Sequence, residues 1–125
     1  MRRIIAALAI LIIVFGSAIS VYLKIISSVD RLTYISCEIR DSVTQKKKTD
    51  FWQTERLVSE WDKVEAFMGA FLNHSELDEI EIGIKNISDY HGQGLTDEYL
   101  EELNNVINRL EHLKESEKPV LRNIF

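Results

Sequence analysis

The chain carries no charged residue over a run of twenty, from Ile4 to Leu23. Arg2 and Arg3 precede this run, and Lys24 follows it. Twenty helical residues rise about 30 Å, which is the thickness of the hydrocarbon core of a bilayer. Inside lipid the backbone groups must pair within the segment, so a run of this kind is almost forced to be helical. The sequence therefore predicts an N-terminal transmembrane anchor over residues 1–24.

Two other interpretations of this run are open. A cleavable signal peptide would have Gly16, Ser17 and Ala18 as its small-residue cleavage site. A buried core helix of a soluble protein is the third interpretation, but twenty uncharged residues are too many for an amphipathic helix. The apolar run also continues beyond Ala18, whereas signal cores are shorter than a bilayer span. These observations favour an uncleaved anchor.

Positive charges on the two sides of the run predict its orientation. Arg2, Arg3 and the terminal amine lie before it, and Lys24, Arg31 and Arg40 lie after it. The first group is closer to the run and belongs to a very short tail. We therefore expect a single-pass protein of the cytoplasmic membrane, with the N-terminus in the cytoplasm and the remainder extracytoplasmic.

The remainder of the chain is acidic. Beyond residue 24 it has 12 basic and 20 acidic residues, which gives a formal charge of −8. A domain with this balance repels nucleic acid, whose binding requires clustered Lys and Arg, and it repels an anionic lipid surface. The basic run at residues 46–48 is interpreted as a solvated turn between helices. No nucleic-acid partner is expected.

Apolar residues keep a helical spacing directly after the anchor. A helix is predicted to run to about Gln45, with Ser36 filling one position of its stripe, and residues 25–48 form this membrane-proximal segment. It either joins a bundle or stands apart as a stalk. The stripe consists of Ile25, Val29, Leu32, Ile39 and Val43.

A second helix is predicted to begin at Thr49 or Asp50, either of which can cap it, with Gln53 reaching back to the first turn. It is expected to end near Asn73. Its apolar stripe consists of Leu57 or Val58, Trp61, Val64, Met68, and Phe71 with Leu72.

A third helix is predicted from a cap at Ser75 to a stop at Gly92 and Gly94. Its apolar seam consists of Leu77, Ile80, Ile84, Ile87 and His91. A fourth helix is predicted from a cap at Thr96 to Pro119. Its seam consists of Leu103, Val106, Ile107, Leu110 and Leu113.

Alternation typical of strands is absent from the sequence, so the domain is predicted to be all-α. Short connections make successive helices antiparallel neighbours. We expect an antiparallel bundle of three to four helices over residues 49–118, alone or with the membrane-proximal helix. Residues 119–125 form an apolar C-terminal tail.

Motifs that carry a reaction are missing, because the sequence has neither a glycine-rich phosphate loop nor a nucleophile motif with a plausible base. We therefore predict a non-enzymatic protein without a cofactor. His74, Asp78 and Glu81 share one face of a helix and are the candidates for a metal site. That face flanks Leu77 and lacks a second histidine at fixed spacing, so a helix cap exposed to solvent is the favoured interpretation.

Two tryptophans and the single cysteine allow two interpretations each. Trp52 and Trp61 lie nine residues apart on one predicted helix, where aromatic residues more often form core than a ligand platform. Trp52 could instead close the end of the bundle. Cys37 is the only cysteine, which excludes an intramolecular disulfide. It is expected to be a small buried hydrophobe, although it could cross-link two copies.

Residues 74–81, with the sequence HSELDEIE, resemble a motif of a small bacterial family, domain of unknown function 4363. The resemblance extends to the region of Trp52 and Trp61, to residues 110–112 and to the closing residues 121–125. The loop from Gly92 to Gly94 departs from it, since similar proteins carry a more charged turn there. The resemblance implies one membrane segment, about a hundred helical residues and a bacterial envelope, but no activity.

The leading hypothesis from the sequence is a non-enzymatic envelope protein whose bundle binds a second membrane protein or a second copy. The candidate surfaces are the stripe from Ile25 to Val43 and the terminal Ile124 and Phe125, with Trp52 and Trp61 as further candidates. The alternative is an extracytoplasmic sensor or ligand-binding domain that uses His74, Asp78 and Glu81 for a metal.

Overall fold

The structure is a computed structural model that describes residues 1–46 and 51–124, with side chains over residues 1–45 and 52–116. It contains four helices: α1 (Arg2–Lys46), α2 (Phe51–Gly69), α3 (His74–Gln93) and α4 (Thr96–Ile124). No strand occurs in the part of the chain that the structure describes. The predicted all-α fold is therefore confirmed. The proposed caps at Thr49 and Asp50 lie outside the described residues, as do Lys47 and Lys48 of the basic run.

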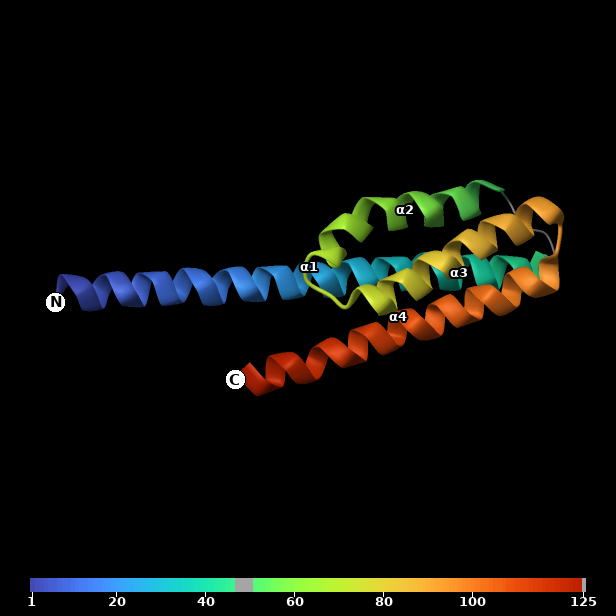
Figure 1. The fold of residues 1–125 in the computed structure, drawn as a ribbon. Helices are drawn as coiled ribbons and strands as arrows, with labels where there is room; N and C mark the ends of the chain where they lie inside the picture. The colour runs from blue at the N-terminus through green and yellow to red at the C-terminus, as the bar shows by residue number, and fades with distance from the viewer. Residues whose placement is uncertain (47–50, 125) are drawn as a thin grey trace.

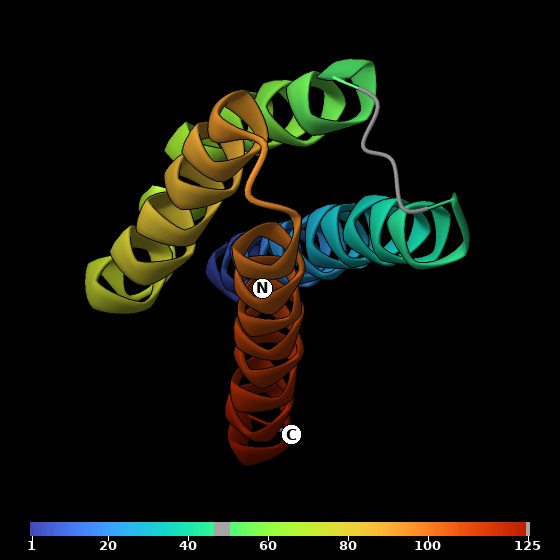
Figure 2. The ribbon, with the colours of Figure 1, turned by 90° about the vertical axis from the view of Figure 1, so that its right-hand side faces the viewer.

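The four helices form an antiparallel bundle, and the second half of α1 is one of its four corners (Figure 1). Helix α1 packs against α2 and α4, and α3 packs against the same two helices. The described backbones of α1 and α3 do not come close to each other, and neither do those of α2 and α4. Figure 2 shows this arrangement from the end of the bundle that lies furthest from the N-terminus. The first half of α1 extends away from the bundle alone.

The apolar stripe of α1 is buried inside the bundle, as its helical spacing predicts. Ile25, Val29, Leu32, Ile39 and Val43 are each at most 3% exposed, and Ser36 is fully buried with them. The membrane-proximal helix therefore joins the bundle and does not form a stalk. The same burial corrects the hypothesis that this stripe is a surface for a partner, because α2 and α4 already cover it.

Helix α2 ends at Gly69, four residues before the predicted end near Asn73. Leu57, Trp61 and Met68 are buried as expected. Phe71, in contrast, lies beyond the helix and is 55% exposed, so its assignment to the core was wrong. The predicted stripe continued the helical spacing beyond Gly69, but the chain there forms a turn and not a helix.

Helix α3 is capped by Asn73 and not by Ser75. The Asn73 side chain accepts a hydrogen bond of 2.9 Å from the Ser75 backbone N–H, and Asn73 has the extended backbone of a cap residue. Asparagine and serine are similarly good caps, so spacing alone could not separate them. The predicted seam is otherwise confirmed, because Leu77, Ile80, Ile84 and Ile87 are buried.

Gly94 ends α3 in the left-handed conformation, with φ at 71°. Its N–H donates to the His91 carbonyl at 3.1 Å, and the Leu95 N–H donates to the Tyr90 carbonyl at 3.0 Å. This pair of bonds is a Schellman motif. Gly92 lies inside the helix, so only one of the two predicted glycines stops it.

Helix α4 differs from the prediction at both ends. Thr96 is its first residue, and the Leu95 carbonyl accepts the first helical bond from Tyr99, so Leu95 has the cap position predicted for Thr96. The helix also continues through Pro119 to Ile124. A proline removes one backbone N–H, and here the loss is confined to a single turn of a long helix. Residues 119–124 therefore extend α4 and are not a separate tail.

Candidate functional site

The free half of α1 has the dimensions of a membrane span. Residues 1–20 are exposed throughout, and this apolar segment is the one candidate span among the described residues. It is not covered by any other part of the bundle, whereas a soluble core helix would be. Length and composition alone also fit a signal sequence near an N-terminus.

Ion pairs connect the second half of α1 to its two neighbours. Lys114 on α4 donates to Asp30 at 2.7 Å, and Arg56 on α2 donates to Glu38 at 3.3 Å. The hydrogen bond with Asp30 is the main reason why the pKa of Lys114 is raised. Exposed pairs contribute little stability. They show which residues of α4 and α2 lie level with Asp30 and Glu38 of α1.

A buried polar cluster connects α2, α3 and α4 at the far end of the bundle. The Thr54 hydroxyl lies 2.9 Å from the Tyr99 hydroxyl and 3.1 Å from Nδ1 of His91. The rings of His91 and Tyr99 meet edge to face. Thr54 and Tyr99 are each 1% exposed, and burial raises the pKa of Tyr99. This cluster is a structural feature, because its groups are bonded to one another and do not converge on open space.

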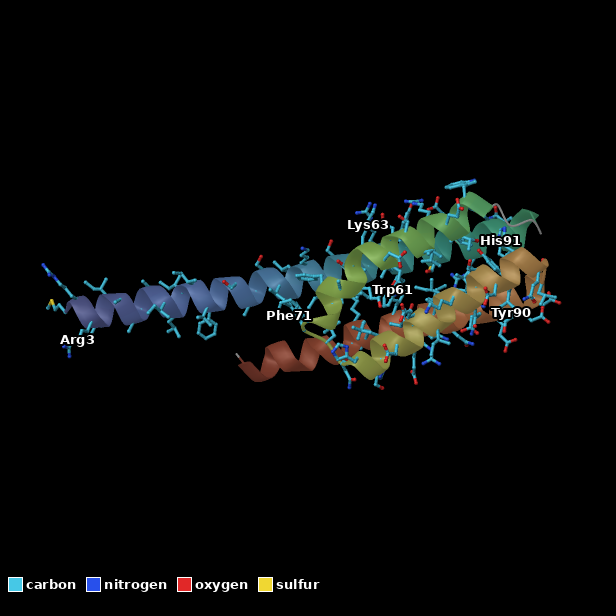
Figure 3. The ribbon with its side chains drawn as sticks, turned by 45° about the horizontal axis from the view of Figure 1, so that its top comes forward. Arg3, Trp61, Lys63, Phe71, Tyr90 and His91 are labelled. Carbon is cyan, nitrogen blue, oxygen red and sulfur yellow. The ribbon has the colours of Figure 1, made fainter. Side chains whose placement is uncertain are left out.

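Helices α2 and α3 leave an open groove on their outer side. It is lined by Glu55, Val58, Ser59, Asp62, Lys63 and Ser88. Val58, Ser59 and Ser88 are small, and the charged part of the lining consists of two carboxylates and the ammonium group of Lys63. The lining therefore has a net negative charge and can accept an apolar ridge with basic flanks. Figure 3 shows Lys63, one of the lining residues, pointing outward from the bundle and Trp61 pointing into it.

A second hollow lies between α3 and α4, but ion pairs bridge it. Arg109 is bonded to Glu79, and Nε2 of His112 lies 3.8 Å from Glu76. The same four residues line the hollow with Asn108. Since these side chains are already paired across it, this hollow is less open to a partner than the groove between α2 and α3.

The candidate metal ligands do not converge. Among the residues that the structure describes, no group of three His, Cys, Asp or Glu side chains is placed to hold a metal ion. His74 is the first residue of α3 and lies near Gly69. Glu81 instead meets Glu65 on α2, and desolvation followed by this neighbouring carboxylate raises the pKa of Glu65.

The other residues that the sequence suggested as candidates lie in different environments. Trp61 is 2% exposed and belongs to the core, as expected for the favoured interpretation. Trp52 is 57% exposed, so its assignment to the core was wrong. Cys37 is partly buried against the core. Ile124 ends α4, its side chain is not among those described, and Phe125 lies outside the described residues.

Sequence reasoning missed Tyr99 and the groove. Tyr99 lies four residues before Leu103, so it continues the seam of the fourth helix and could have been found by extending that seam toward the N-terminus. The groove gives no comparable signal. Ser59 and Ser88 lie on different helices, and only the packing of α2 on α3 brings them together.

The fold defines a class of protein with a long N-terminal helix that is apolar in its first half and forms one corner of a four-helix bundle in its second half. A family model described as domain of unknown function (DUF4363) matches residues 19–124. The chain belongs to this family. The match covers the whole bundle and begins inside the apolar run. No curated protein and no solved structure matched the chain.

Proposed function

We propose that this protein is a non-enzymatic interaction module of the bacterial cell envelope, held at the cytoplasmic membrane by the first half of α1. The bundle is extracytoplasmic and binds a segment of a second membrane protein. The observation that carries this proposal is the unbroken course of α1 from the apolar segment into the core of the bundle. This course keeps the bundle close to the bilayer.

Confinement to a membrane favours partners that lie in the same membrane. Restricting two proteins to one surface raises their effective concentration, so a groove of modest affinity is sufficient for binding. The groove between α2 and α3 supports this role because, of the two hollows described above, it is the one whose walls are not joined by an ion pair. Its carboxylates, Glu55 and Asp62, select a helix with basic flanks, since charge complementarity sets specificity and orientation.

Site-specific photo-cross-linking in intact cells tests the groove. A photoreactive residue replaces Ser59, which lines the groove, and the matched control replaces Asn104, an exposed residue of α4. We expect an adduct from position 59 that the control does not give and that Asp62→Lys abolishes. Equal adducts from both positions, or none from position 59, would contradict the proposal. An adduct of twice 14.5 kDa identifies a second copy as the partner.

Anchoring and topology are tested separately. The full-length protein should stay with the membrane fraction in alkaline carbonate and keep residues 1–18, as measured by the mass of its N-terminus. Protease added to cells with a permeable outer layer should digest the bundle. Release by carbonate would reject the anchor, and protection of the bundle would reverse the orientation.

A further inference from the structure

We propose that the turn between α2 and α3 is a second membrane contact, in which Phe71 enters the interfacial region of the same bilayer that holds α1. This inference rests on the proposed anchoring by α1 and goes beyond it. A single span would leave the bundle free to tilt. A second contact would hold one end of the bundle against the lipid.

The contacts of Lys24 fix the level of this turn. Lys24 directly follows the uncharged run, so its ammonium group marks the boundary between hydrocarbon and water. Nζ of Lys24 lies over the ring of Phe67, 4.1 Å from the ring centroid. Phe67 in turn packs against Phe71, with ring centroids 5.2 Å apart. The end of α2 is therefore at the level where α1 enters the bilayer.

The turn itself has the composition of an interfacial segment. Residues 66–73, with the sequence AFMGAFLN, contain no charge, although the surrounding domain is strongly acidic. Phe71 is 55% exposed, and Ala70 beside it is exposed as well. Figure 3 shows Phe71 at the end of the bundle from which the free half of α1 emerges. An exposed apolar ring such as that of Phe71 is stabilised when it leaves water and is buried at the boundary between headgroups and acyl chains.

Lipid fits this surface better than a protein partner for two reasons. The turn lies at the level of Lys24, where the proposed span ends, so it reaches the interface without any further association. The last turns of α4 also run toward the same end (Figure 1). Lys114 on α4 lies level with Asp30 on α1. From Asp30 back to Leu23, the end of the uncharged run, α1 rises roughly 10 Å. From Lys114 to Ile124, α4 rises about 15 Å in the same direction, so it is long enough to reach that level. Two elements of the bundle thus reach the boundary together.

Spin-label accessibility on the full-length protein tests the contact. The protein carries Cys37→Ser and is placed, one copy per disc, in phosphatidylcholine nanodiscs, which excludes a second copy and uses a lipid without net charge. A label at Ala70→Cys reports the turn while leaving both phenylalanines intact. Labels at Gln93→Cys, at the opposite end of the bundle, and at Ile12→Cys, inside the span, are the controls.

Collisions with oxygen, which partitions into lipid, are compared with collisions with a water-soluble nickel chelate. We expect the oxygen-to-nickel ratio at position 70 to exceed that at position 93 several-fold. Phe71→Ser should lower it to the value at position 93, with the helical circular dichroism unchanged. A water-like ratio at position 70 with a lipid-like ratio at position 12 would overturn the inference and leave the anchor. A water-like ratio at position 12 would overturn both, and lipid-like ratios at both 70 and 93 would mean that the bundle lies flat.

Discussion

Tyr99 shows how a single hydroxyl can connect three helices. It is buried, and its hydroxyl bonds to Thr54 at 2.9 Å, while Thr54 also meets His91. Tyr99→Phe removes one buried hydrogen bond without creating a cavity, and we expect it to lower the free energy of unfolding by about 1 kcal/mol at neutral pH. Urea unfolding followed by circular dichroism measures the change. An unaltered midpoint would mean that the cluster is stabilised by apolar contact alone.

The same residue makes the stability depend on alkaline pH. Burial raises the pKa of Tyr99 above its ordinary value of 10.0. In the unfolded chain the phenol therefore ionises first, and its contribution to stability is complete below about pH 10 and is lost as pH rises toward the folded-state pKa. As pH rises above about 10, the wild type should lose stability more steeply than Tyr99→Phe. Parallel curves for the two proteins would contradict this expectation.

Gly94 is the glycine whose backbone conformation demands its identity, with φ at 71°. Gly94→Ala should lower the free energy of unfolding by about 1 kcal/mol, since a side chain disfavours the left-handed region. Gly92→Ala is the matched control, because Gly92 lies inside α3 with open space around it. There we expect stabilisation of up to about 1 kcal/mol from helix propensity. Equal effects of the two changes would reject the cap.

At the scale of elements, the contact between α3 and α4 depends on Gly83. A Cβ atom at this position would lie 2.6 Å from Cγ2 of Val106, which is shorter than any normal contact. Gly83→Ala should therefore push the two helices apart and cost about 1–3 kcal/mol, despite the better helix propensity of alanine.

A double-mutant cycle separates steric overlap from other effects of Gly83→Ala. In the background of Val106→Ala the clashing methyl group is absent, so the second substitution should cost less than it does in the wild type. Thermal unfolding of the four proteins gives the coupling energy. A cost that is the same in both backgrounds would show that Val106 is not the obstacle.

The helices were predictable from the sequence to different degrees for a physical reason. Burial of one face is a repeated signal, so the seams of α1, α3 and α4 could be identified from their spacing, apart from Tyr99 at the start of α4. The end of a helix depends on individual hydrogen bonds of its cap residue. The sequence offered equivalent cap residues at the start of α3, Asn73 and Ser75. Phe71 was misplaced because its spacing continues a stripe that the backbone leaves at Gly69.

The candidate surfaces were less predictable because they depend on what the helices cover. The stripe of α1 was predicted to be a possible partner surface, because the sequence does not show that α2 and α4 cover it. The groove between α2 and α3 and the cation–aromatic contact of Lys24 with Phe67 both join residues far apart in the chain. Neither has a periodic signal, so a single sequence could not reveal them.

At the scale of the whole molecule, the proposed span and the bundle share helix α1. A break in α1 should lower the stability of the bundle but leave the membrane retention of the span unchanged. Ser27 is an exposed residue of α1 just beyond Lys24. Ser27→Pro removes one backbone hydrogen bond and bends the helix, and we expect a loss of about 3 kcal/mol in bundle stability. Retention in alkaline carbonate should be unchanged, because the apolar run is intact.

Ser27→Ala is the control for this change, since it keeps the backbone hydrogen bond and should leave both quantities near their wild-type values. Guanidine unfolding in detergent measures the stability, and the carbonate pellet measures retention. If proline left the bundle as stable as alanine does, the packing of α1 would not depend on its continuity.

Helix α1 has no hinge between Arg2 and Lys46, so its length limits how far the bundle can stand from the membrane. Residues 24–46 rise about 35 Å, so every binding face of the bundle stands within that height of the lipid. Nothing in the described helix lets it reach further. If a bound partner twisted or tilted the bundle, α1 would transmit that movement to its segment in the bilayer. A movement of the membrane segment would likewise be transmitted to the bundle.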